Sequence, residues 1–261
     1  FIAIGRTNAT FLPATSLTVG TNATMKFDVP WTVNYPITLE AGGWLSHSAN
    51  TTNEAFKLNL TVNGNLNVQS GGQINVDGVG YARDQGPGGG GFGYGTGGSH
   101  GGRGGTYSGV FGARMMYGSI TAPTNCGSGG GSGYVSEGGG AVRLIVTGTN
   151  TVKGAISALG LNVGEGGGAG GSILLTTGTL TGNGVLRANG GTGSPRGGGG
   201  RIAVILTNDT VFGNVTLQAY AGGANAAAGT IYTETPSQGP GKGILLVDAG
   251  NLVSTAEIST M

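Results

Sequence analysis

A repeat of about 30 residues is the feature of this sequence that most constrains its fold. Four segments begin with glycine followed by an apolar run, and they are spaced 31, 29 and 29 residues apart. A second ladder of short apolar segments has spacings of 30, 31 and 28 residues. Two sets of positions that keep one period indicate a stack of similar structural units. The first set starts at Gly140, Gly171, Gly200 and Gly229, and the second at Ile156, Leu186, Leu217 and Leu245.

Within each repeat, apolar residues alternate with polar ones, as at Val142 and Leu144. Side chains two positions apart on a strand point to the same face, so this alternation predicts short strands with one buried face. Glycine, asparagine and threonine lie between these strands, and no segment shows a helical period. The chain is therefore predicted to be all-β: a parallel β-solenoid (right-handed β-helix) with coils of about 30 residues and a glycine-rich insertion. Its inward columns would be Val142, Ile173, Ile202 and Ile231 on one wall, and Ala158, Ala188, Ala219 and Val247 on another.

Three of these segments resemble a known kind of repeat. The sequences Ser172-Ile-Leu-Leu-Thr-Thr, Leu186-Arg-Ala-Asn-Gly-Gly191 and Gly197-Gly-Gly-Gly-Arg-Ile-Ala203 are similar to the glycine-rich right-handed parallel β-helix repeats of large extracellular surface and adhesin-like proteins. The resemblance covers residues 58–82 and 138–251. It implies a fold and a location outside the cell, and it says little about biochemical activity.

Composition divides the chain further. Residues 1–56, with three prolines and both tryptophans, are predicted to be an N-terminal β segment or cap, residues 57–251 the solenoid, and residues 252–261 a C-terminal tail. Residues 86–140 interrupt the ladder with 24 glycines. They are either a flexible insertion or an ordered stack in which extended glycine strands pack at close distance. Aromatic residues within the segment favour partial order.

Charge and hydropathy exclude several classes of protein. Twelve basic against eleven acidic residues give a net charge of +1, which argues against nucleic-acid binding because that requires a basic surplus. The longest apolar runs are too short to span a membrane. The chain begins at Phe1, so we expect a processed or excerpted piece of a longer product. Together with the low charge, six possible glycosylation sites predict an extracellular or cell-surface location. These sites are Asn8, Asn22, Asn50, Asn59, Asn208 and Asn214.

No residue pattern predicts catalysis, a cofactor or a metal site. The eleven carboxylates contain no Asp-X-Asp pair, whereas acid–base chemistry on saccharides needs two carboxylates close together. His47 and His100 are isolated from other ligand types, and the single cysteine, Cys126, is expected to be a small buried residue. The acids are expected in turns and on the surface.

The sequence therefore predicts a non-enzymatic extracellular protein with a structural or adhesive role, or the self-assembling subunit of a surface filament. Its expected partners are further copies of itself, in a polymer, and surface glycans. The apolar residues Phe1, Ile2 and Ile4 are predicted to form an assembly strand that adds to the sheet of a neighbouring copy. The alternative is a carbohydrate-binding or polysaccharide-cleaving β-helix protein whose substrate stacks on Trp31, Trp44 or tyrosines.

Overall fold

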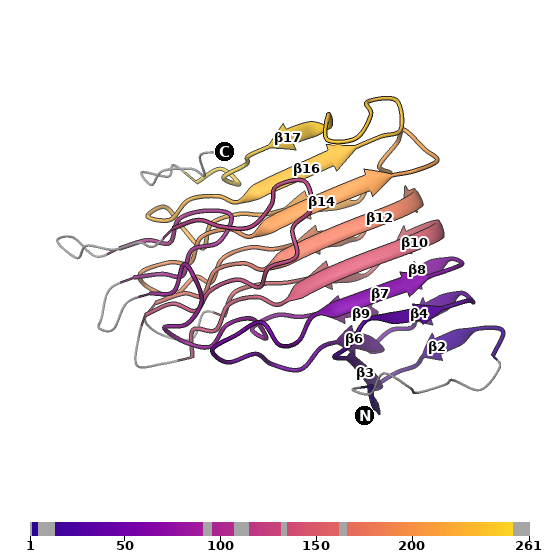
Figure 1. The fold of residues 1–261 in the computed structure, drawn as a ribbon, viewed down its shortest axis with the longest axis horizontal. Helices are drawn as coiled ribbons and strands as arrows, with labels where there is room; N and C mark the ends of the chain where they lie inside the picture. Colours follow the sequence, from indigo (N-terminus) through magenta and orange to yellow (C-terminus); the bar gives the residue numbers. More distant parts are fainter. Residues whose placement is uncertain are drawn as a thin grey trace.

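The computed structural model describes residues 2–4, 14–90, 96–106, 115–131, 135–161 and 166–252. The described strands form two sheets, of seven and ten strands, in which successive strands are stacked one above another in chain order, and no helix occurs among these residues (Figure 1). The seven-stranded sheet has the order β1 (Ile2–Ile4), β3 (Thr24–Phe27), β6 (Trp44–Ser46), β9 (Gln73–Asn75), β11 (Ala155–Ser157), β13 (Val185–Arg187) and β15 (Thr216–Gln218).

The ten-stranded sheet contains the longer strands. Its main path is β2 (Leu17–Val19), β5 (Ile37–Leu39), β8 (Leu66–Val68), β10 (Ala141–Val152), β12 (Ser172–Thr181), β14 (Arg201–Leu206), β16 (Thr230–Glu234) and β17 (Ile244–Leu246). Strand β7 (Leu58–Val62) pairs with β10, and β4 (Trp31–Val33) pairs with β7. Every strand pairing in the two sheets is parallel except that of β16 with β17.

The predicted column on the long strands is confirmed. Val142 pairs in register with Ile173, Ile173 with Ile202, and Ile202 with Ile231. All four side chains are at most 2 % exposed. Full burial of such a side chain contributes about 1.5–3 kcal/mol, so this column is a main source of folding free energy.

The predicted second wall is confirmed for its three alanines, since Ala158, Ala188 and Ala219 are all buried. The prediction for Val247 is wrong. The last copy of the ladder forms β17, which turns back and pairs antiparallel with β16 in the other sheet. Two glycines with positive φ, Gly239 and Gly241, reverse the chain between these strands.

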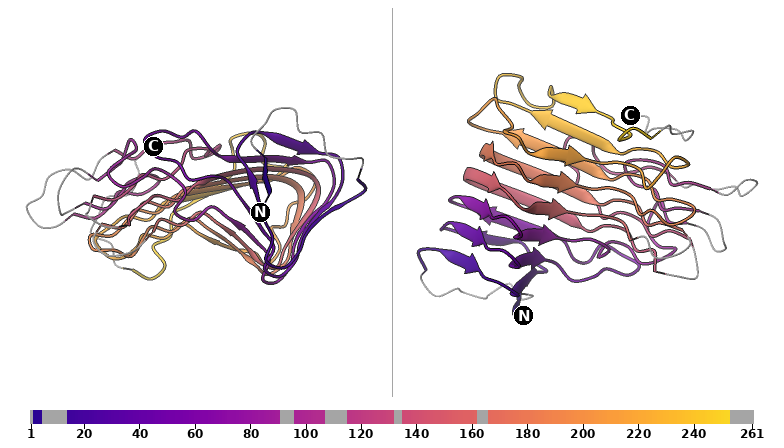
Figure 2. Two further views of the ribbon diagram at one scale, coloured as in Figure 1. Left: turned by 90° about the horizontal axis from the view of Figure 1, so that it is seen from below. Right: turned by 180° about the vertical axis from the view of Figure 1, so that it is seen from behind.

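The predicted fold class, a closed parallel β-solenoid, is wrong. The strands form two flat, mostly parallel sheets that do not close into a coil. After β11, β13 and β15, the chain leaves the sheets through segments rich in glycine and alanine, such as residues 158–161 and 166–171. These segments lack the side chains that would form a third inward column. They pack on one another instead, beside the sheets (Figure 2, left).

The N-terminal region is continuous with the two sheets rather than a separate layer. Strand β5 pairs with β8, and β6 pairs with β9, so residues 14–56 extend both ladders. Phe27, Ile37 and Leu45 are fully buried in the same core cluster as the later strands. Figure 2, right, shows the resulting uninterrupted stack from β3 to β16.

Candidate functional site

The glycine-rich segments form a hydrogen-bonded layer beside the sheets. We call the described residues 79–90, 96–106, 126–131, 136–140, 166–171, 190–200 and 222–229 the glycine-rich layer. The amide of Gly98 donates to Gly167 O at 2.9 Å, and Gly198 donates to Gly98 O at 2.9 Å. Gly139 donates to Ala169 O at 2.9 Å. Each segment is thus bonded to more than one other, and residues 86–90, 96–106, 126–131 and 136–140 of the insertion belong to this ordered layer.

Close packing explains why this layer requires glycine. A Cβ atom at Gly97, Gly171 or Gly198 would lie within 3.0 Å of a backbone carbonyl oxygen, a distance that real Cβ atoms essentially never show. The neighbouring backbones approach too closely for any side chain. The glycine content of the sequence is therefore a packing requirement of this layer, as in other arrays where only glycine fits between adjacent chains.

Buried polar side chains connect segments of the glycine-rich layer to one another and to Tyr117, which lies just before residues 126–131. The hydroxyl of Tyr117 donates to Cys126 O at 2.6 Å and lies 2.7 Å from Ser128 Oγ. Ser128 Oγ also accepts from the amide of Gly88 at 3.0 Å. Burial raises the pKa of Cys126 to about 12, so its thiol is held neutral. The expectation of a buried cysteine is confirmed.

His100 belongs to the glycine-rich layer and is fully buried, close to Arg201 of β14 in the ten-stranded sheet. Its Nδ1 donates to Gly170 O at 2.8 Å, and its ring contacts that of Tyr117 in a tilted arrangement, with centroids 4.7 Å apart. Burial, and then the positive charge of Arg201, lowers the His100 pKa to about 3. Arg201 donates from Nε to Tyr117 O at 2.9 Å and from Nη1 to Thr230 Oγ1 at 3.0 Å. The histidine is therefore neutral, and its contacts are structural.

His47 and Asn50 connect β6 to the strands and segments around it. His47 Nδ1 donates to Ser48 O at 2.7 Å, and its Nε2 accepts from the amide of Ala141 at 3.2 Å. Burial lowers the His47 pKa. Asn50 donates to Phe56 O and Val79 O and is only 4 % exposed. Neither histidine belongs to a metal-binding cluster, since the described residues contain no group of three His, Cys, Asp or Glu that could hold a metal ion.

The described carboxylates for which hydrogen bonds are seen serve local structure. Asp28 accepts from the amide and hydroxyl of Ser48, and Asp77 accepts from Ser157 Oγ and the amide of Leu159. Glu54 accepts from Tyr81, Asn125 and Lys57. Glu234 accepts from the hydroxyl of Tyr232 and the amide of Gly241. These acids sit at turns and strand ends, spread along the length of the stack.

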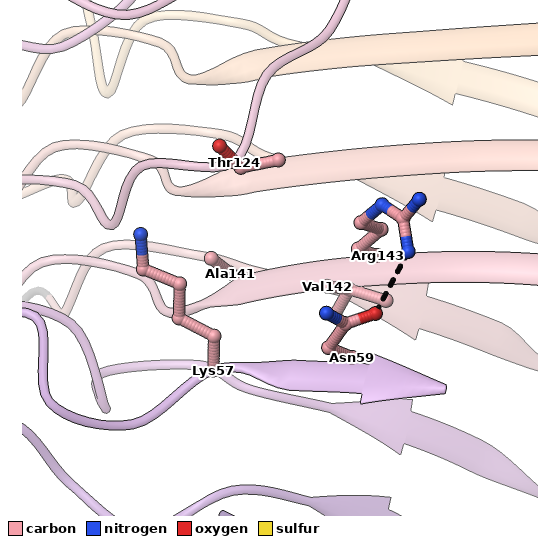
Figure 3. Close-up of a pocket in the computed structure, with 6 residues that line it drawn as sticks. All are labelled: Lys57, Asn59, Thr124, Ala141, Val142 and Arg143. Atoms are coloured by element: carbon pink, nitrogen blue, oxygen red, sulfur yellow. Dashed lines mark hydrogen bonds between the residues drawn. The ribbon is translucent and has the colours of Figure 1, made fainter. Parts of the chain in front are cut away.

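A shallow pocket of about 240 Å³ lies at the edge of the glycine-rich layer, over β7 and β10. Lys57 and Arg143 stand on either side of Ala141 and Val142, with Thr124 on the opposite wall and Asn59 beside Arg143 (Figure 3). Arg143 Nη1 donates to Asn59 Oδ1 at 2.9 Å. No sequence pattern predicted this group of residues. The only available signal was the strand register that places Arg143 beside Asn59, 84 residues earlier.

The candidate glycosylation sites differ in accessibility. Asn22, Asn208 and Asn214 are exposed, and Asn59 is partly exposed. Asn50 is buried, and its side-chain amide donates hydrogen bonds to Phe56 O and Val79 O. A glycan on this nitrogen would break these bonds. Asn8 lies outside the described residues.

The predicted assembly strand has a partner in its own chain. Ile2–Ile4 forms β1 and pairs in parallel with β3, Ile2 opposite Met25 and Ile4 opposite Phe27. The segment therefore has a partner strand within its own chain, whereas the sequence prediction gives it one in a neighbouring copy. Phe1 lies outside the described residues.

The two tryptophans proposed as a stacking platform lie in different sheets. Trp31 is in β4, partly buried against the core with its ring centroid 6.2 Å from that of Phe27. Trp44 is in β6 and is 39 % exposed. The two rings do not form one surface for a sugar.

Comparison with known proteins adds nothing to this geometry: no protein-family model, curated protein or solved structure matches the chain. Across the described ranges, no helix has the length and apolar character needed to cross a membrane.

Proposed function

We propose that this chain is a non-enzymatic extracellular protein with a structural or adhesive role that associates with further copies of itself. The observation that carries the proposal is the glycine-rich layer. Its backbone is committed to hydrogen bonds between segments, and at most of its glycines there is no room for a side chain. Such a layer presents few side chains that could take part in catalysis, and its closely packed, hydrogen-bonded backbone suits a structural element.

The use of the carboxylates supports the same proposal. Asp28, Glu54 and Asp77 each accept hydrogen bonds from residues that fix the local backbone. Acid–base catalysis requires a carboxyl group directed at a substrate and free to exchange a proton. A cleaving enzyme is therefore the less favoured candidate. The pocket beside Arg143 keeps binding of a saccharide as a second candidate function.

The end of the ten-stranded sheet supports self-association. Strand β17 is the last strand, and within the described chain nothing pairs with its outer edge. Its three residues are apolar and exposed: Ile244 by 62 %, Leu245 by 39 % and Leu246 by 49 %. Exposed apolar edge strands readily pair with another chain. We propose this edge as the contact between copies.

The test compares the wild-type chain with Ile244→Lys by analytical ultracentrifugation and negative-stain electron microscopy over a range of concentrations. A lysine on the edge strand is expected to abolish the association. Val211→Lys is the matched control, because Val211 is also 62 % exposed but lies outside the strands. Association that persists in Ile244→Lys, or a wild-type chain that stays monomeric at every concentration, would refute the proposed edge contact.

A further inference from the structure

The pocket between Lys57 and Arg143 has features of a ligand-binding site, which the proposed structural role does not require. The guanidinium of Arg143 has five N–H donors, and one is engaged by Asn59. The ion pairs among the described residues are Lys57 with Glu54 and Arg83 with Asp84, so no described carboxylate pairs with Arg143. A guanidinium fork without an anionic partner lines an open pocket.

The neighbouring charges make the pocket selective for an anion. Lys57 is paired with Glu54, and Glu54 also accepts hydrogen bonds from Tyr81 and Asn125. The negative charge is therefore compensated from several sides, while the positive charge of Arg143 is not. A planar guanidinium binds a carboxylate through two parallel hydrogen bonds, which makes it more specific than an ammonium group.

The other lining groups define what the anion is attached to. The hydroxyl of Thr124 and the amide of Asn59 can donate to and accept from hydroxyl groups, and Ala141 supplies a small apolar floor. The volume of about 240 Å³ lies below the usual range of about 300–1,000 Å³ for ligand pockets. It admits one small cyclic unit rather than a long chain segment.

We propose that this pocket binds the carboxylate of a uronic acid, one residue of an acidic polysaccharide. The carboxylate lies on Arg143, and the sugar hydroxyls contact Asn59 and Thr124. The choice of a saccharide rests on the proposed extracellular role, whereas the choice of a carboxylate rests on Arg143. Binding at this pocket requires no association between copies, because its lining comes from one chain.

The test measures binding of D-galacturonate to the full chain by isothermal titration calorimetry, with D-galactose and sulfate as comparison ligands. Saturable binding of galacturonate at least tenfold tighter than that of both comparison ligands is expected. Equal binding of galactose would overturn the role of the carboxylate. Equal binding of sulfate would overturn the assignment to a uronic acid and leave a general oxyanion site.

Variants locate the site. Arg143→Gln is expected to weaken galacturonate binding at least tenfold, and Arg143→Lys, which keeps the charge but loses the fork, to weaken it by a smaller factor. Arg187→Gln is the matched control: Arg187 is also a strand arginine with one side-chain hydrogen bond, to Ser157, but it lies in the other sheet. Unchanged affinity in Arg143→Gln would overturn the proposal.

Two further measurements keep the outcome interpretable. Circular dichroism establishes that each variant is folded, and Thr124→Val tests the opposite wall if Arg143→Gln does not fold. Thr124→Val is expected to weaken galacturonate binding more than sulfate binding, and an equal effect on both would overturn the placement of the sugar. Ile244→Lys should bind galacturonate normally, so failure of this site is distinguishable from failure of the proposed self-association.

Discussion

The backbone amide of Gly171 donates a 2.8 Å hydrogen bond to the carbonyl oxygen of Ala158. This bond joins the residue after β11 in the seven-stranded sheet to the residue before β12 in the ten-stranded sheet. The same link recurs in three other repeats at 2.7 Å: Gly140 to Val76, Gly200 to Ala188 and Gly229 to Ala219. The glycine that begins each repeat is therefore the point at which the two sheets and the glycine-rich layer meet.

The first prediction tests that meeting point. Gly171→Ala should destabilise the protein, because its Cβ would overlap the carbonyl oxygen of Gly140, which is fixed by the hydrogen bond that it accepts from Ser172. Overpacking costs about 1–3 kcal/mol, and we expect the upper end of that range. Urea denaturation measures the loss. Gly20→Ala is the control, since its Cβ would meet only the flexible Glu40 side chain, and an equal effect of both variants would contradict the packing argument.

The second prediction concerns the buried column. Ile173→Ala should lower the free energy of unfolding by about 2–5 kcal/mol, because Ile173 is fully buried and its removal leaves a cavity. Ile244→Ala should change it by less than about 0.5 kcal/mol, because Ile244 is exposed. Both values come from chemical denaturation. Similar values for the two variants would mean that the column is not the core.

The third prediction is a loss of stability in mild acid. Burial lowers the pKa of His47 below the ordinary 6.5 and that of His100 to about 3, so the unfolded chain binds protons that the folded chain does not. Stability is therefore complete above pH 6.5 and falls as the pH drops below it, by up to about 1.4 kcal/mol per pH unit from His100, with a further loss from His47 in the same direction.

The free energy of unfolding measured between pH 7.5 and 5 checks this sign, in a range where carboxylates contribute little. His100→Asn removes one titrating group and should flatten the dependence. A wild-type stability that is constant or rises toward pH 5 would contradict the buried neutral state of both histidines.

The fourth prediction uses Cys126 as a reporter of the glycine-rich layer. Its thiol is fully buried with a pKa near 12, so it should not react with a thiol reagent at pH 8 until the layer opens. Tyr117→Phe removes the hydroxyl bonded to Cys126 O and Ser128 Oγ, and it should accelerate labelling while costing about 1–3 kcal/mol. Rapid labelling of the native wild-type chain would show that the cysteine is accessible.

The periodicity of the sequence predicted which strands pair and which side chains they bury, but not the path of the chain between the strands. The pairing of Val142 with Ile173 follows from one repeated pattern, because apolar alternation and spacing together determine register. The course of the chain after Ala158 does not follow from that pattern. Glycine has no side chain, so the glycine segments show no alternation of apolar and polar residues. The sequence therefore shows no sign that these segments leave the sheets. The antiparallel turn into β17 likewise depends on the backbone at Gly239 and Gly241.

The candidate site could not be predicted from the sequence for a different reason. Lys57, Thr124 and Arg143 come from three separate parts of the chain, and none belongs to a motif. Thr124 reaches the pocket only because the segment 115–125 of the insertion passes over the sheet, where Asn125 O accepts from Ser172 Oγ at 2.6 Å. To predict the pocket, one must know the path of the insertion. Composition alone does not decide whether the insertion is flexible or ordered, and so it does not give that path.

Hydrogen–deuterium exchange with mass spectrometric detection tests the central claim most directly, namely that the glycine-rich segments are a folded, hydrogen-bonded layer. Peptides covering residues 96–106, 126–131 and 166–171 should exchange as slowly as peptides from β10 and β12, because the amides of Gly98, Gly127 and Gly170 are bonded to other segments of the layer. Exchange of these peptides at the rate of an unstructured chain, with the strands still protected, would contradict it.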